Sequence, residues 1–109
     1  MAIINFDQLF SDLKSGVEAL AKNSFKDFEE QAKTDGQQAI TDLKTNLIQW
    51  TKELETGSLT KEDLEDLLQE EEALDKMVAL KQAGLAEVHV DKFRNDIITM
   101  IVTTVTKMI

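Results

Sequence analysis

The chain has 109 residues, enough for one modest domain, so a multi-domain enzyme is excluded. Its 12 Lys and Arg residues against 21 Asp and Glu residues give a formal charge of −9, which argues against nucleic-acid binding through a basic surface. No cysteine and only one histidine are present, which excludes disulfides, thiol catalysis and zinc sites built from Cys or His pairs. With 42% hydrophobic residues and no proline, the composition predicts a folded, helix-rich protein.

The N-terminal segment Met1-Ala2-Ile3-Ile4-Asn5 has no basic residue ahead of its short apolar start, so it is not typical of a signal peptide. The least polar stretch runs from Ile97 to Ile109 and falls well short of the ~20 apolar residues that a spanning helix needs. We therefore expect a cytoplasmic protein without a transmembrane segment.

Apolar residues recur with helical spacing between Phe6 and Leu54. Sorted by an eleven-residue repeat, they fill two columns: Phe6, Val17, Phe28, Ala39, Trp50 and Phe10, Ala21, Ala32, Leu43, Leu54. Eleven residues make three helical turns, so both columns lie on one face, although plain amphipathicity imitates such a repeat and is the favoured explanation. The pattern predicts one helix from about residue 6 to 55. Gly36 is the one place where this helix could bend, since glycine costs ~1 kcal/mol in a helix interior.

Gly57 can end this first helix in a left-handed conformation, which predicts a tight turn. Thr60 fits the N-cap of a second helix, with Asp63 completing a capping box. We expect that helix to run from about Lys61 to Ala83 and to end at Gly84. Its expected buried side chains are Leu64, Leu67, Leu68, Leu74, Met77 and Val78, with Leu80 or the stem of Lys81 as further candidates.

The last segment is rich in β-branched residues and resembles a strand by propensity. Periodicity favours a helix, because threonines and apolar residues then form opposite stripes. The threonines are Thr99, Thr103 and Thr106, and the apolar residues are Phe93, Ile97, Ile101, Val105 and Met108. Asp91 is the expected N-cap, and residues 88–90 form either a connector or an earlier start.

A single helix over residues 6–55 would be about 75 Å long. A compact domain of this size has a radius of gyration near 13 Å, so the chain is expected to leave apolar surface uncovered. The fold class expected is therefore an all-α helical bundle that forms a dimer or higher homo-oligomer, or binds another helical protein. The expected contact surface, here called the apolar stripe, consists of Phe6, Phe10, Leu13, Val17, Leu20, Phe28, Leu43, Trp50 and Leu54.

Residues 53–75 contain ten acids and one base, whereas the rest of the chain sums to zero charge. This segment predicts an acidic docking surface for a basic partner, formed by Glu65, Asp66, Glu70, Glu71 and Glu72. The alternative, a solvated helix face, is the more usual meaning of such a charge run. No calcium-loop spacing accompanies the acids.

No catalytic, cofactor-binding or metal-ligating set emerges from the sequence. His89 lies between Glu87 and Asp91, but on a helix the three side chains point in different directions. No paired Glu-x-x-His motif, phosphate-binding glycine loop or nucleophile elbow is present. We therefore expect a protein that is not an enzyme and that needs no cofactor.

The chain resembles two protein families over short stretches or in general pattern. In size, acidity and helical-hairpin pattern the chain is similar to the small secreted WXG-type proteins, although Trp50 is followed by Thr51-Lys52 and the Trp-x-Gly turn is missing. The run Leu20 to Glu30 is similar to phasins, amphipathic proteins that coat polyester storage granules.

The expected function is a non-catalytic interaction or scaffolding module that self-associates or binds a helical partner through the apolar stripe. Two alternatives stay open. One is a peripheral lipid- or granule-surface binder that lays the same stripe on an interface. The other is an acidic chaperone or antagonist of a basic partner.

Overall fold

The computed structural model describes residues 4–109, and all regular secondary structure in that range is α-helical. Residues 1–3, part of the N-terminal segment considered above, lie outside it. The helices are α1 Phe6–Ser24, α2 Glu29–Asp42, α3 Lys44–Thr56, α4 Lys61–Gln69, α5 Glu72–Lys76, α6 Val78–Gln82 and α7 Glu87–Met108. The all-α prediction is confirmed.

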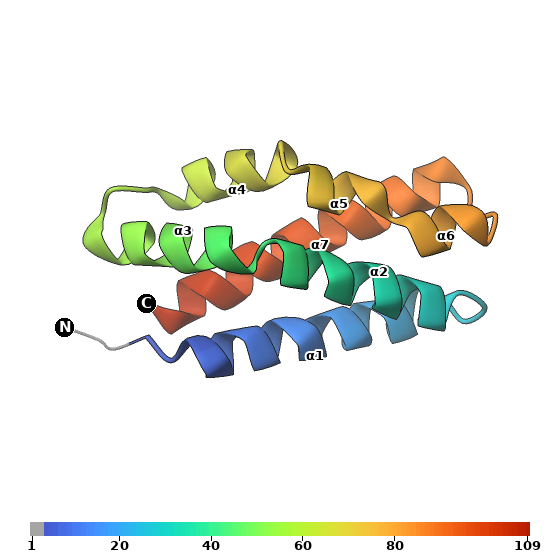
Figure 1. Ribbon diagram of the computed structural model, residues 1–109, viewed down its shortest axis with the longest axis horizontal. Coiled ribbons are helices and arrows are strands. Elements are labelled where there is room, and N and C mark those ends of the chain that lie inside the picture. Colours follow the sequence, from blue (N-terminus) through green and yellow to red (C-terminus); the bar gives the residue numbers. More distant parts are fainter. Residues whose placement is uncertain (1–3) are drawn as a thin grey trace.

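The helices form four antiparallel rods, namely α1, α2–α3, α4–α5–α6 and α7 (Figure 1). α1 packs against α2 and α7, α4 packs against α7, and α2 packs against α5 and α6. Each rod therefore lies beside its neighbours in an up-down-up-down four-helix bundle. The bundle measures 46 × 24 × 19 Å and has a radius of gyration of 13.8 Å.

The prediction of one helix over residues 6–55 is wrong, because the chain reverses between Ser24 and Glu29. No glycine or proline marks this reversal. Phe25 leaves the helix in an extended conformation, and its ring meets Phe93 edge-on, with 5.3 Å between ring centroids. Packing of this aromatic pair against the core favours the turn, and such a tertiary contact is invisible in local sequence.

No break occurs at Gly36, because α2 continues through it. A Cβ atom at this position would lie 2.5 Å from Val17 Cγ1, so the glycine allows α1 and α2 to approach closely. The junction between α2 and α3 falls instead at Leu43. The helical hydrogen bonds continue across it, since Leu47 N–H donates to Leu43 O at 2.8 Å.

The turn between α3 and α4 is confirmed. Gly57 has φ 83°, and the Ser58 N–H donates to Glu53 O at 2.9 Å. Thr60 and Asp63 form both bonds of the capping box, each 3.1 Å long. Gly84, with φ 90°, likewise lies in the turn before α7. These local signals determine where the helices on either side end and begin.

The second predicted helix, Lys61 to Ala83, is divided into α4, α5 and α6. At the last break Met77 has φ 33°, the left-handed region that side chains disfavour. The new start is capped from another rod, since Asp35 accepts hydrogen bonds from Ala79 N–H at 3.0 Å and Leu80 N–H at 2.8 Å. A cap supplied from a distant part of the chain explains why the local pattern missed this break.

Most of the side chains expected in the core of this rod are buried: Leu64, Leu68, Leu74, Met77 and Leu80. Leu67 is only half-buried. Val78 is 51% exposed, so its predicted burial is wrong. The break at Met77 changes the direction of the chain directly before Val78 and takes it off the inward face.

The C-terminal segment is helical rather than a strand, as periodicity predicted. The helix α7 begins at Glu87 with Ala86 as its N-cap, so Asp91 is not the cap and the earlier start is correct. Phe93, Ile97, Ile101 and Val105 are buried. Thr99 and Thr103 are exposed on the opposite side.

Candidate functional site

The apolar stripe is used inside the chain itself. Leu13, Val17 and Leu43 are at most 1% exposed. The remaining members are partly buried and pack against the core: Phe6, Phe10, Leu20, Phe28, Trp50 and Leu54. The expectation that the chain leaves this stripe uncovered was wrong, because the reversal at residues 25–28 folds one half of it onto the other.

An acidic groove with an apolar floor lies along α4. It is lined by Leu59, Asp63, Asp66, Leu67 and Glu70, has a volume of about 330 Å³, and is called the α4 groove below. The core-facing side of α4 carries Leu64 and Leu68, which leaves the groove residues on the outside. The two lining leucines are half-buried, whereas the three carboxylates are exposed.

The groove unites only part of the predicted acidic docking surface. Asp66 and Glu70 line it, but Glu65 borders a separate hollow between α4 and α7. Glu71 is half-buried and accepts a hydrogen bond from Asn46 Nδ2 at 3.3 Å, and Glu72 begins α5. Glu65 lies on a different side of α4 from the groove, whereas Glu71 and Glu72 lie beyond the break at residues 70–71 that separates α4 from α5.

Sequence reasoning missed three groove residues, namely Leu59, Asp63 and Leu67. Asp63 was assigned only to the capping box and Leu67 only to the core. A regular spacing in the sequence could have identified them. Asp63 follows Leu59 by four residues and Leu67 follows Asp63 by four, which places all three on one side of the start of α4. The same spacing joins Asp66 to Glu70.

The negative charge of the groove is not neutralised within residues 4–109. The ion pairs found there join Lys33 to Glu18, Lys92 to Asp96 and Arg94 to Asp75, and none involves a groove carboxylate. Carboxylates lining an apolar floor are suited to ammonium or guanidinium groups carried on an apolar segment.

Arg94 holds α7 against the end of α4. Its Nη1 donates to Gln69 Oε1 at 2.9 Å, its Nη2 donates to Gln69 O, and its Nε lies 2.7 Å from Asp75 Oδ1. The Nε contact is an ion pair without the alignment of a hydrogen bond. Since the Arg94 side chain is only 14% exposed, this cluster anchors the end of the helix that carries the groove.

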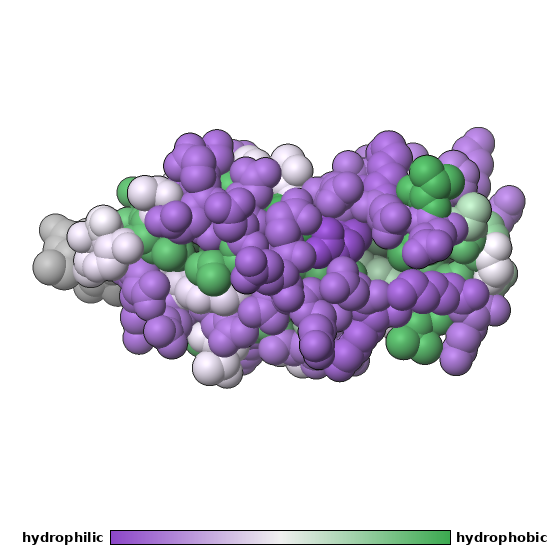
Figure 2. All heavy atoms as spheres, turned by 90° about the horizontal axis from the view of Figure 1, so that it is seen from above, coloured by the Kyte–Doolittle hydropathy of each residue, from purple (hydrophilic) through white to green (hydrophobic). Residues whose placement is uncertain are grey.

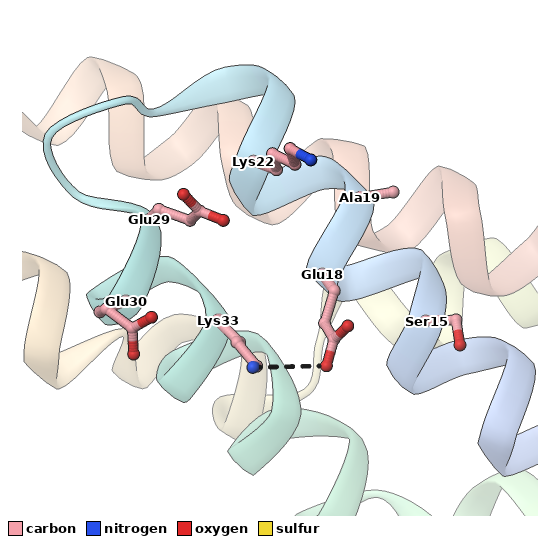
Figure 3. Close-up of a pocket in the computed structure, with 7 residues that line it drawn as sticks. All are labelled: Ser15, Glu18, Ala19, Lys22, Glu29, Glu30 and Lys33. Carbon is pink, nitrogen blue, oxygen red and sulfur yellow. Dashed lines mark ion pairs between the residues drawn. The ribbon is translucent and has the colours of Figure 1, made fainter.

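A larger hollow of about 420 Å³ lies between α1 and α2 (Figure 3). Its walls carry both signs of charge, and Lys33 Nζ pairs with Glu18 Oε1 across it at 3.4 Å. Lys22, Glu29 and Glu30 complete its charged lining. Because the charges are mixed and Ala19 is its one hydrophobic lining residue, this hollow has little selectivity for either an ion or an apolar group.

The face seen in Figure 2 is mostly hydrophilic, with apolar atoms in small separate patches. Among the described residues, no three His, Asp or Glu side chains are placed to hold a metal ion. In the same range, no helix combines the length and apolarity needed to cross a lipid bilayer. Comparisons with protein families, with curated proteins and with solved structures find no match to this chain.

Proposed function

We propose that the protein is a non-catalytic interaction module that binds a basic amphipathic segment of another protein in the α4 groove. The observation that carries this proposal is the combination of half-buried Leu59 and Leu67 with exposed Asp63, Asp66 and Glu70 around one hollow. An apolar side chain of the partner fills the hollow, and its flanking Lys or Arg residues meet the carboxylates.

The charges and the leucines contribute differently to this binding. Uncompensated carboxylates accelerate the encounter with a basic segment and make the affinity sensitive to salt. Burial of Leu59 and Leu67 contributes to the lifetime of the complex, because apolar area removed from water is worth roughly 25 cal/mol per Å². The carboxylates and the leucines are both needed for the groove to prefer a basic amphipathic segment over other cations.

This proposal develops the acidic-partner hypothesis. Binding through the whole apolar stripe would require the bundle to open, because its members Leu13, Val17 and Leu43 are buried in the core. A lipid-binding role would require the same opening. The α4 groove is accessible in the closed bundle, so docking there carries no unfolding cost.

Fluorescence anisotropy with a labelled helical peptide of leucine and lysine tests the proposal. We expect Asp66→Asn/Glu70→Gln to weaken binding at least about tenfold, consistent with the loss of two charge contacts. Leu67→Ala should shorten the lifetime of the complex.

The matched control is Glu29→Gln/Glu30→Gln, which removes the same charge from the mixed hollow between α1 and α2. It should change affinity less than about twofold. Equal weakening by both double variants would show that net charge, not the groove, attracts the peptide, and the proposal would be wrong.

A further inference from the structure

A second charged surface, opposite in sign to the α4 groove, follows the junction between α1 and the α2–α3 rod. It consists of Phe6, Phe10, Lys14, Lys44 and Lys52 and is called the lysine seam below. Lys44 Nζ lies 5.6 Å from the centroid of the Phe10 ring, and Lys52 Nζ lies 5.9 Å from that of Phe6. Each of these two lysines on α3 thus sits over a half-buried aromatic ring of α1.

The seam contains a hollow of about 120 Å³ lined by Phe10, Lys14, Ile40, Thr41 and Lys44. The Thr41 hydroxyl already donates to Gln37 O. The ammonium groups of Lys14 and Lys44 are therefore the side-chain donors in this hollow that are left for a ligand. Within the described range, no carboxylate lies within ion-pair distance of any of the three seam lysines. The seam therefore offers positive charge around partly exposed aromatic surface.

The two surfaces match in chemistry and in spacing. Lys44 and Lys52 are eight residues apart on α3, which corresponds to about 12 Å along a helix. Asp63 and Glu70 are seven residues apart, which corresponds to about 10 Å. A helix like α4 laid along the seam can therefore place a carboxylate near each lysine at the same time, with Leu59 and Leu67 available to cover the aromatic rings.

We infer that the lysine seam of one copy docks in the α4 groove of a second copy. The inference rests on the proposed function, since it names this chain itself as a source of the basic amphipathic surface that the groove binds. Groove and seam are different patches, so the contact is heterologous, and association continues until a ring closes or a chain of copies forms.

Light scattering over micromolar to millimolar concentrations tests the inference on the full chain. The wild-type mass should rise with concentration and fall again in high salt. A seam variant, Lys44→Glu/Lys52→Glu, and a groove variant, Asp66→Lys/Glu70→Lys, should each remain monomeric. Their mixture should regain association, because the intact groove of one variant meets the intact seam of the other and the two reversed patches are also opposite in charge.

Circular dichroism checks that both variants keep the helical fold, and the neutral variant Lys44→Gln/Lys52→Gln provides a milder check of the seam. Lys22→Glu/Lys26→Glu, which makes the same charge change elsewhere, should associate as the wild type does. A mixture that stays monomeric overturns the inference.

The proposed function and the inference can fail separately. A wild-type protein that is monomeric throughout the range but still binds the leucine–lysine peptide in its groove overturns self-docking and leaves the proposed function standing. A monomeric protein that does not bind the peptide overturns both.

Discussion

At the residue scale, two glycines on helices lie where rods approach each other closely. A Cβ at Gly36 would lie 2.5 Å from Val17 Cγ1, and one at Gly16 would lie 2.7 Å from Met100 Sδ. Val17 is fully buried and branched at Cβ, so it has little freedom to move. Met100 is half-buried and flexible. An added Cβ atom is therefore expected to destabilise the protein at Gly36 but not at Gly16, although the two distances are similar.

We expect Gly36→Ala to lower the free energy of unfolding by up to about 2 kcal/mol. Overpacking against Val17 costs about 1–3 kcal/mol and outweighs the gain of about 1 kcal/mol in helix propensity. Urea denaturation measures the change. In the comparison variant Gly16→Ala, Met100 can shift, so stability should be unchanged or slightly higher. Equal destabilisation of the two variants would contradict this account.

Asp35 is the residue-scale feature that links two rods through backbone hydrogen bonds. Asp35→Asn keeps the shape but replaces one acceptor oxygen by an amide that faces an N–H donor. We expect a loss of about 1–2 kcal/mol in stability, together with faster hydrogen exchange at Ala79 and Leu80. Asp27→Asn, at an exposed position in the reversal, is the control and should leave both amides protected. Unchanged exchange in Asp35→Asn would rule out this capping role.

At the element scale, the third rod is built from short helices held in place by the rods beside it. α5 and α6 each contain five residues, too few to be stable as isolated helices. Asp35 caps α6, and Arg94 binds both Gln69 at the end of α4 and Asp75 in α5. The position of the α4 groove thus depends on contacts made by α7.

We expect Arg94→Met to destabilise the protein by about 1–3 kcal/mol, since it removes charge-assisted bonds from a side chain that is 14% exposed. It should also reduce peptide binding to the groove, because the end of α4 loses its anchor. Lys92→Met on the same helix is the matched control. Its exposed pair with Asp96 is worth less than about 1 kcal/mol, so thermal unfolding should distinguish the two variants clearly. Equal effects would count against the anchoring role.

At the scale of the whole molecule, charge is distributed unevenly over a well-packed bundle. Residues 53–75 hold ten acids and one base. Only one of the ion pairs within residues 4–109, that of Arg94 with Asp75, involves an acid of this segment. Like charges on the third rod therefore repel one another in the folded state, and this repulsion weakens as salt screens it.

The free energy of unfolding should consequently rise between low and moderate NaCl concentration, as measured by urea denaturation at neutral pH. Over the same range, binding of a basic peptide should weaken. Opposite salt dependences of stability and binding are expected because the same carboxylates repel one another and attract the partner. A fall in stability on adding salt would indicate that attractive pairs dominate instead.

The elements that the sequence predicted well are those whose signals are local. Gly57, Thr60 and Asp63 encode a turn and a cap within a few residues, and both are present. The helical nature of the last segment followed from its periodicity. For the candidate site, the charge run predicted one acidic surface of five residues, whereas only Asp66 and Glu70 of that set line the α4 groove.

Most inward-facing residues can be assigned from the sequence, because helical periodicity identifies the apolar side of a helix wherever the chain turns. Val78, directly after the break at Met77, is an exception. All ten members of the two eleven-residue columns are buried in the core or packed against it, on both sides of a reversal that the pattern did not show. The positions of the chain reversal and of the breaks in the third rod come from tertiary contacts instead. The Phe25 ring packs against Phe93, and Asp35 caps the start of α6. Both features depend on contacts between residues that are distant in sequence, which a local pattern does not show.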